Sequence, residues 1–305
     1  MTDDLSWLKD RIRSDGPPLI IDGGMGSELE KSGVPMDEIV WSARALLSHP
    51  EAVRETHEAY IIAGAEVITT NTFSSARHML EPGGLGKYLN DINQNAVKLA
   101  QRARDSVATG PVAIAGSICE WVSHDDPEWN SPEAVSRSIK EQAEILAEAG
   151  VDLITLEMCQ TEDISIAAVE AVLEVGLPLW IGVCAQINKG ASTLSVFDYE
   201  AFDFESLVKA LAGYPAMMMN IMHTPVPDVE QAIKVVRQYR NGPVGVYPES
   251  GYFAMPNWQF VDVIEPDELA RTAQGWVQSG VRMVGGCCGI GPEHIAALRQ
   301  EFGGD

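Results

Sequence analysis

The sequence AGAEVIT at residues 63–69 returns in altered form as AEAGVDLIT at residues 147–155 and as VQSGVRMVG at residues 277–285. Each copy reads as the end of a helix, made of small residues and Gly, followed by a short apolar stretch. Near-continuous apolar stretches are typical of strands buried in a parallel sheet, and Gly commonly follows the last turn of a helix. The three copies therefore predict a repeated unit in which a helix leads into a buried strand.

The same alternation extends over the rest of the chain. Eight candidate strands lie at residues 18–23, 66–72, 112–118, 153–159, 179–185, 216–222, 244–249 and 281–288. Amphipathic helical patterns lie at residues 50–63, 88–107, 132–149, 162–175, 204–211, 226–239, 266–279 and 292–302. Eight alternating pairs predict an α/β fold, a (β/α)8 TIM barrel, with a doubly wound open sheet as the alternative. No linker or change in composition divides the chain, so we expect a single domain over residues 1–305.

The composition excludes several classes of protein. The 305 residues are 46% hydrophobic and 21% charged, which is ordinary for a globular enzyme, and the formal net charge is −23. So negative a chain is repelled by a phosphate backbone and by an anionic membrane surface, so we expect no nucleic-acid and no membrane partner. The start resembles no signal peptide, and five cysteines do not form a disulfide framework. We expect a cytoplasmic protein. The sequence is compatible with a monomer and with a homo-oligomer.

In such a barrel the functional groups lie at the carboxyl ends of the strands. All five cysteines occur at predicted strand ends. Cys119, Cys159 and Cys184 are interpreted as small buried hydrophobic residues. The adjacent pair Cys287 and Cys288 follows two glycines, which suits a soft metal held by thiolates, although a redox pair or plain core packing fits the spacing equally.

Several motifs in this order resemble the homocysteine S-methyltransferase family. The matching segments are DGGMGSELEKSGV (22–34), VWSARAL (40–46), AGAEVITTNTF (63–73), AGSI (115–118), LEMCQTEDISIAAVEA (156–171), YPESG (247–251), GGCCG (285–289) and PEHI (292–295). The resemblance implies a zinc-dependent (β/α)8 enzyme. Such an enzyme moves a methyl group from a donor onto the thiolate of homocysteine and makes methionine.

The resemblance implies three cysteine ligands for the zinc, and one of them is absent here. Cys287 and Cys288 match the family's vicinal pair, but the family's Asn-Cys reads Asn220-Ile221. His223 could complete the set, because alternation along a strand puts it on the same face as position 221. The remaining alternatives are a third ligand from Cys159 or Cys184, or no catalytic zinc.

The resemblance also implies roles for the residues that would bind substrate. Asp22 and Glu157 match the acidic residues that bind the amino group of homocysteine. The other residues expected at the substrate are Gly23, Gly24, Thr72, Ser117 and Asn220. Glu249 stands where the family pattern has Asn.

Methyl donors in the family are onium compounds or methylfolate. Aromatic faces attract an onium cation, and the candidates are Trp41, Phe73, Tyr247 and Tyr252. The chain ends soon after the last helix, so we expect a small free donor, with S-methylmethionine or S-adenosylmethionine ahead of betaine. The sequence thus predicts a homocysteine S-methyltransferase with Zn2+. Its rivals are a zinc-free relative acting on another thiol, selenol or onium compound, and a non-catalytic amino-acid-binding protein.

Overall fold

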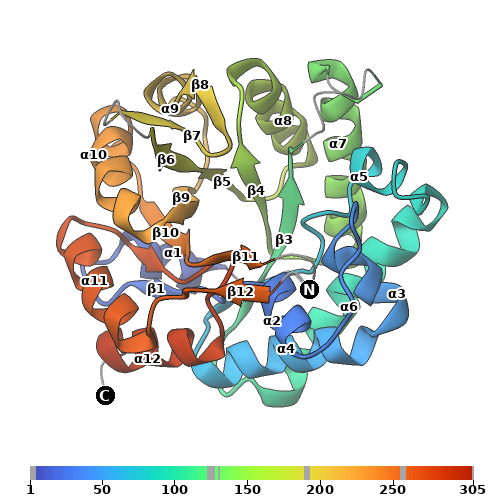
Figure 1. Cartoon of the computed structure of the whole chain (residues 1–305), viewed down its shortest axis with the longest axis horizontal. Helices are drawn as coiled ribbons and strands as arrows, with labels where there is room; N and C mark the ends of the chain where they lie inside the picture. The colour runs from blue at the N-terminus through green and yellow to red at the C-terminus, as the bar shows by residue number, and fades with distance from the viewer. Residues whose placement is uncertain (1–4, 122–127, 130, 189–192, 255–258, 304–305) are drawn as a thin grey trace.

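Eight parallel strands form a ring at the centre of the molecule (Figure 1). The computed structural model describes residues 5–121, 128–129, 131–188, 193–254 and 259–303. In order around the ring the strands are β1 (Leu19–Ile20), β13 (Met283–Val284), β10 (Val244–Glu249), β9 (Met218–Pro225), β5 (Leu179–Val183), β4 (Leu153–Cys159), β3 (Ala113–Cys119) and β2 (Val67–Thr69). A bridge between Ile21 and Val67 brings the two ends of this order together. The predicted TIM barrel is confirmed, and the open sheet is wrong because its two edges would stay apart.

Helices surround the ring, and the first of them lies at the amino ends of the strands. They are α1 (Ser6–Arg13), α2 (Met25–Lys31), α3 (Ala45–Ser48), α4 (Pro50–Ala63), α5 (Arg77–Leu80), α6 (Leu89–Val107), α7 (Pro132–Ala149), α8 (Glu162–Val175), α9 (Phe204–Leu211), α10 (Val229–Tyr239), α11 (Pro266–Gln278) and α12 (Pro292–Phe302), with short 3-10 turns at Ser42–Arg44, Gly86–Tyr88 and Val226–Asp228. All eight predicted helices are present, and the one expected from residue 226 begins at Val229 because a 3-10 turn precedes it.

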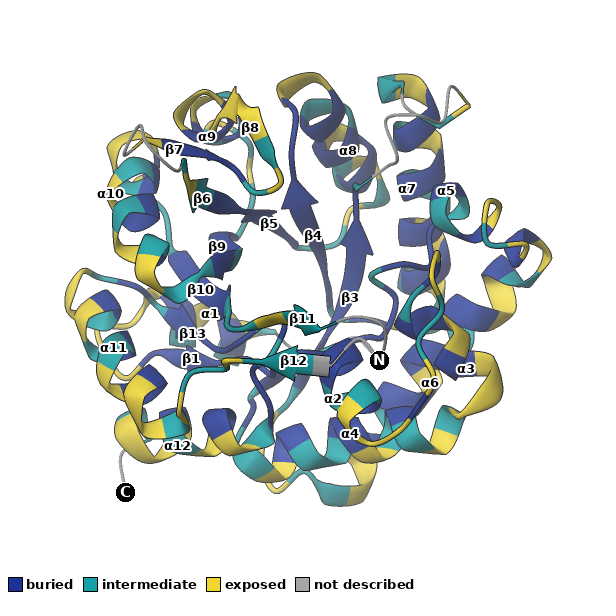
Figure 2. Ribbon diagram, viewed as in Figure 1, coloured by how far each residue is buried: buried dark blue, intermediate teal, exposed yellow. Residues whose placement is uncertain are grey.

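The core lies between the ring and the helices. In Figure 2 the barrel strands are dark blue along their length, and the helices are dark blue where they face the ring. Trp180, Tyr60 and Phe204 are the largest side chains that are fully buried. None of the helices in the described part of the chain has both the length and the apolar character needed to span a lipid bilayer.

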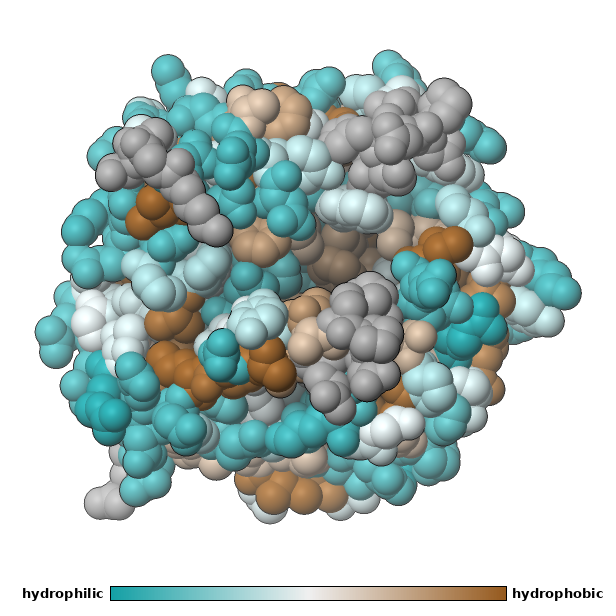
Figure 3. Space-filling model, in the orientation of Figure 1, coloured by the Kyte–Doolittle hydropathy of each residue, from teal (hydrophilic) through white to brown (hydrophobic). Residues whose placement is uncertain are grey.

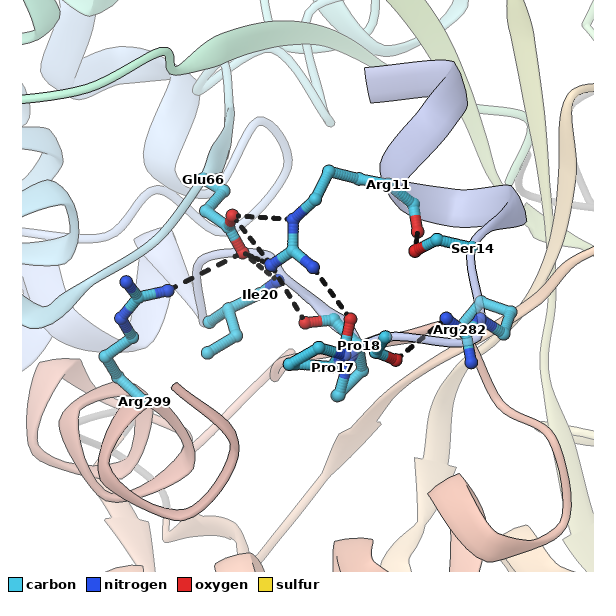
Figure 4. A network of polar contacts seen from close by, with 9 residues as sticks. Arg11, Ser14, Pro17, Pro18, Ile20, Glu66, Arg282 and Arg299 are labelled. Carbon is cyan, nitrogen blue, oxygen red and sulfur yellow. Dashed lines mark hydrogen bonds and ion pairs between the residues drawn. The ribbon is translucent and has the colours of Figure 1, made fainter. Parts of the chain in front are cut away.

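An ion-pair network joins the amino-terminal helix to the starts of two barrel strands (Figure 4). Arg11 of α1 lies 2.9 Å from Glu66, which immediately precedes β2, and donates to the carbonyl of Pro17 at 2.8 Å. Glu66 also accepts a hydrogen bond from the backbone N–H of Ile20 at 3.1 Å. α1 therefore packs at the amino ends of the strands, which leaves the carboxyl ends to the loops.

Two small antiparallel sheets, which periodicity did not predict, accompany the carboxyl ends. One consists of β6 (Ala185–Ile187), β7 (Leu194–Val196) and β8 (Tyr199–Asp203), and the other of β11 (Tyr252–Ala254) and β12 (Gln259–Val261). Both are insertions after barrel strands, β6–β8 after β5 and β11–β12 after β10. They supply walls to the cavity described next.

Candidate active site

A cavity of about 340 Å³ lies at the carboxyl ends of the barrel strands. Its volume is within the range of small-molecule sites. In Figure 3 the surface is hollowed near the middle of the face shown, and apolar atoms lie within the hollow. The predicted site residues that line the cavity are Asp22, Gly23, Gly24, Trp41, Phe73, Ser117, Glu157, His223, Tyr247, Cys287 and Cys288.

Three soft ligand atoms meet on one side of this cavity. The Sγ of Cys287 lies 3.4 Å from Nδ1 of His223 and 4.0 Å from the Sγ of Cys288. All three ligand atoms lie within 4.8 Å of one another. β9 continues past position 221, so His223 reaches the cavity from its end, whereas Ile221 is fully buried in the core.

The surroundings of the Cys287 thiol disfavour its thiolate form. The hydrogen bond with Cys288, burial and the charge of Cys288 raise the pKa of the Cys287 thiol well above its ordinary value, and His223 opposes this only in part. A divalent cation stabilises adjacent thiolates directly. The donor set of one imidazole and two sulfurs therefore fits a metal ion such as zinc.

Glu157, on β4, forms the acidic floor of the cavity. Its Oε2 accepts a hydrogen bond from Ser117 Oγ on β3, and its Oε1 accepts one from the Tyr247 hydroxyl on β10 at 2.9 Å. Burial raises the pKa of Glu157, and these two hydrogen bonds act in the opposite direction. The adjacent strand β3 and the more distant strand β10 thus both fix the orientation of the carboxyl group.

Asp22 is the second acidic group of the floor. It follows β1 and accepts a hydrogen bond from the backbone N–H of Thr69 at 2.7 Å. Burial raises its pKa well above the usual value, and the charge of Glu157 raises it further. Among the described residues that line the cavity there is no Lys or Arg. A bound ammonium group would give these two carboxyls a cationic partner and so favour their ionised form.

Three aromatic rings form an aromatic wall of the cavity. Trp41 meets Phe73 edge-on with ring centroids 6.4 Å apart, and it meets Phe253 of β11 in the same manner at 5.9 Å. Gly26 makes room for this wall, since a Cβ there would lie 2.8 Å from the Trp41 ring. Such faces attract cations with little hydration, among them onium groups.

The loops that follow β1 and β13 interlock at the edge of the cavity. The backbone N–H of Gly286 donates to the carbonyl of Asp22 at 3.0 Å, and that of Gly24 donates to Ile290 at 2.9 Å. A Cβ on Gly24 would lie 2.5 Å from the carbonyl oxygen of Cys287. Glycine is therefore needed where the loop that carries the sulfurs approaches the loop that carries Asp22.

Backbone strain is concentrated around the same cavity. Five residues other than Gly have a positive φ in the described part of the chain, and four of them line the cavity. They are Trp41, Met158, Asp198 and His223. Each such conformation costs about 1 kcal/mol or more and is typical of functional sites.

Some predicted residues lie elsewhere, and some lining residues were not predicted. Thr72 is buried and donates to the carbonyl of Ser117 at 2.7 Å, Asn220 is buried within the barrel, and Tyr252 is 57% exposed. Phe253 and Asp198 line the cavity but come from the two small sheets, where no periodic pattern marks them. The roles expected for Thr72, Asn220 and Tyr252 stay predictions.

The alternative sulfur ligands, Cys159 and Cys184, do not belong to the cluster. Cys159 and Cys184 are fully buried and do not line the cavity, and Cys184 Sγ lies 3.9 Å from the carbonyl oxygen of Cys159. His223 is the residue that stands beside the vicinal pair.

Comparison with known proteins gives one consistent result. The family model described as homocysteine S-methyltransferase matches residues 19–302. Homocysteine S-methyltransferase 1 of Zea mays is 27% identical over 96% of this chain and 97% of its own length. Selenocysteine methyltransferase of Astragalus bisulcatus is 25% identical, over 95% of this chain and 94% of its own.

A solved structure resembles the barrel over its whole length. The metallated form of the homocysteine methyltransferase MmuM from Escherichia coli aligns with a TM-score of 0.77 and 25% identity. The alignment covers 98% of this chain and 99% of that chain.

Proposed function

The chain belongs to the homocysteine S-methyltransferase family, and we propose that it transfers a methyl group from a small onium donor to the thiolate of homocysteine, giving methionine. The observation that carries the proposal is that one cavity is lined both by the cluster of His223, Cys287 and Cys288 and by the carboxyls of Asp22 and Glu157. An amino acid with a side-chain thiol has two groups to be held, and the cavity offers a matching pair of subsites.

We further propose that the cluster of His223, Cys287 and Cys288 holds Zn2+. Zinc–sulfur bonds of about 2.3 Å and zinc–nitrogen bonds of about 2.0 Å in a tetrahedron put two sulfurs about 3.8 Å apart and sulfur about 3.5 Å from nitrogen. The two distances from Cys287, 4.0 Å and 3.4 Å, fit that arrangement, and the third pair, Cys288 and His223, lies within 4.8 Å. Three protein ligands leave a fourth position for substrate.

The acidic floor would bind the amino group of the acceptor. The ammonium group would form charge-assisted hydrogen bonds with the carboxyls of Glu157 and Asp22 and lose its water there. Ser117 and Tyr247 hold Glu157 in position, and Thr69 holds Asp22. This binding would fix the position of the acceptor sulfur relative to the cluster. When bound, zinc would lower the pKa of the acceptor thiol so that a thiolate is present at neutral pH.

The aromatic wall would hold the donor. Trp41, Phe73 and Phe253 would face the onium group, and burial of its apolar substituents would add to the attraction. The acceptor sulfur then forms a bond to the methyl carbon as the bond from that carbon to the onium centre breaks, and the electron pair leaves with a neutral thioether. A neutral leaving group, a thioether or an amine, suits this apolar wall, so the wall fits an onium donor of either kind. We favour S-methylmethionine or S-adenosylmethionine and include betaine in the assay.

The test is metal quantification together with a donor panel assayed with homocysteine. We expect about one zinc per chain in the wild type, and loss of zinc and methyl transfer in Cys287→Ala. Cys184→Ala is the matched control, because it removes a buried thiol outside the cavity and should retain zinc. Full activity in Cys287→Ala would exclude the metal from the reaction.

Selenocysteine is the second acceptor to be assayed. The similarity to a selenocysteine methyltransferase supports its inclusion, since a selenol presents the same soft atom to the cluster. We also propose a cytoplasmic location, because a site built on free thiols requires a reducing compartment.

A further inference from the structure

A carboxylate lies beside the imidazole of the cluster of His223, Cys287 and Cys288. Nε2 of His223 lies 3.2 Å from an oxygen of Glu249, while Nδ1 of the same ring faces Cys287. Both side chains are nearly buried, with exposed fractions of 15% for His223 and 14% for Glu249. The ring is therefore held between a sulfur on one side and a carboxylate on the other.

The backbone around Glu249 is joined to the loop that carries the sulfurs. The N–H of Cys287 donates to the carbonyl of Pro248 at 2.8 Å, and the N–H of Ser250 donates to the carbonyl of Cys288 at 3.0 Å. The two neighbours of Glu249 in sequence are thus bonded to the two sulfur-bearing residues. These two hydrogen bonds join the end of β10 to the loop that carries the sulfurs, so they fix the position of Glu249 relative to the cluster.

A second contact restrains the ring itself. Phe197 packs edge-on against the His223 ring, with centroids 4.7 Å apart. Since His223 also has a positive φ of 43°, its position depends on these surroundings rather than on relaxed backbone geometry. A hydrogen bond at one ring nitrogen determines which nitrogen is free for a metal, and Nε2 is the nitrogen that lies beside Glu249.

We propose that Glu249 is a positioning residue of the metal site, which accepts the Nε2–H of His223 and so leaves Nδ1 unprotonated for the ion. This inference rests on the proposed zinc site. Glu249 would also act through its charge. Two thiolates and a neutral imidazole cancel the charge of a divalent ion, and Glu249 adds one negative charge that increases electron donation from the imidazole.

The first test is zinc affinity, measured with Zn2+ alone by competition against a chromophoric chelator. We expect Glu249→Gln to bind zinc about tenfold to a hundredfold more weakly than the wild type, as for other carboxylates that support a metal-bound His. Glu230→Gln is the matched control, because it removes an equal charge from an exposed glutamate that pairs with Lys234. Its zinc affinity should equal that of the wild type.

The second test reads the ring directly and does not depend on activity. Imidazole NMR on protein saturated with Zn2+ should show metal at Nδ1 and a strongly hydrogen-bonded proton at Nε2 of His223, assigned by its loss in His223→Gln. In zinc-saturated Glu249→Gln that proton signal should move upfield. A merely structural role for Glu249 would leave the signal in place.

The two proposals fail in different ways. If the wild type binds zinc and transfers methyl groups while Glu249→Gln keeps the same affinity and the same His223 signals, the role of Glu249 is refuted and the proposed function stands. If the wild type binds no zinc, the metal site and the role of Glu249 both fall.

Discussion

The Tyr247 hydroxyl illustrates how single atoms define this cavity. It donates to Glu157 at 2.9 Å from a residue 90 positions away in the chain. The sequence marked Tyr247 as an aromatic surface for the donor, but its polar end contacts the group expected to bind the acceptor. A contact between distant residues of this kind follows from the closed ring and cannot be derived from spacing.

We predict that Tyr247→Phe weakens acceptor binding. The change removes one of the two hydroxyl donors that orient Glu157, and hydrogen bonds to charged groups contribute about 1.5–3 kcal/mol. The KM for homocysteine should rise about tenfold or more, with a smaller change for the donor. Tyr214→Phe is the matched control, since it removes a hydroxyl that donates to the exposed Glu170 at 2.9 Å. Equal KM values in the two variants would contradict the prediction.

Glu120 is a buried acid that the proposed reaction does not use. Its Oε1 accepts hydrogen bonds from the Ser165 hydroxyl and the backbone N–H of Gln160, each at 2.5 Å. Burial raises the pKa of Glu120 to about 8, and these hydrogen bonds oppose the rise only in part. The folded protein thus holds this proton more tightly than the unfolded chain does.

This proton makes stability depend on pH in a definite direction. Between the ordinary pKa of 4.5 and the raised pKa of about 8, unfolding releases the proton, so the free energy of unfolding should fall as the pH rises. The loss should be on the order of a few kcal/mol and should be absent from Glu120→Gln. Urea denaturation of both proteins at several pH values measures it. Parallel curves for the two proteins would refute the prediction.

Among the elements, the regular helices and barrel strands could be predicted and the inserted sheets could not. A periodic pattern needs several residues in register, and the predicted helix at Pro50–Ala63 has it over its whole length. β7 and β11 have three residues each, too few to show a period. Phe253 on β11 and Asp198 in the turn after β7 were missed for that reason, although both line the cavity.

Helix ends provide a test at the same scale. Gly64 ends α4 with a φ of 109°, and a Cβ there would lie 2.6 Å from the Arg299 side chain. We predict that Gly64→Ala lowers the free energy of unfolding by about 1 kcal/mol or more. Gly275→Ala, inside α11 with open space around the added Cβ, should raise it by about 0.5–1 kcal/mol. Urea denaturation measures both, and shifts of the same sign would refute the argument.

At the scale of the whole molecule, the ring decides which of the distant side chains meet. The sequence supplied the vicinal cysteines and three alternatives for the remaining ligand. His223 on β9 is the one that stands beside them, since β9 extends to Pro225. Strand length and the approach of loops after different strands are properties of the closed barrel, so the sequence left this choice open.

The charge of −23 provides a prediction for the whole protein. A negative field attracts a cationic donor, and salt screens it, shortening the Debye length from about 10 Å at about 0.1 M to about 3 Å at about 1 M. The KM for an onium donor should therefore rise over this range, while that for zwitterionic homocysteine changes less. Glu38→Gln, which removes an exposed carboxylate at the cavity mouth, should reduce the salt dependence. A donor KM independent of salt would refute the prediction.

The interlocked loops after β1 and β13 have a consequence for biosynthesis. The ribosome adds Cys287 and Cys288 only after all eight barrel strands, and their loop docks against Gly24 near the start of the ring. A nascent chain that has emerged as far as His223 holds Asp22 and Glu157 but neither sulfur. The proposed zinc site can therefore form only after the ribosome has added the last strand of the ring.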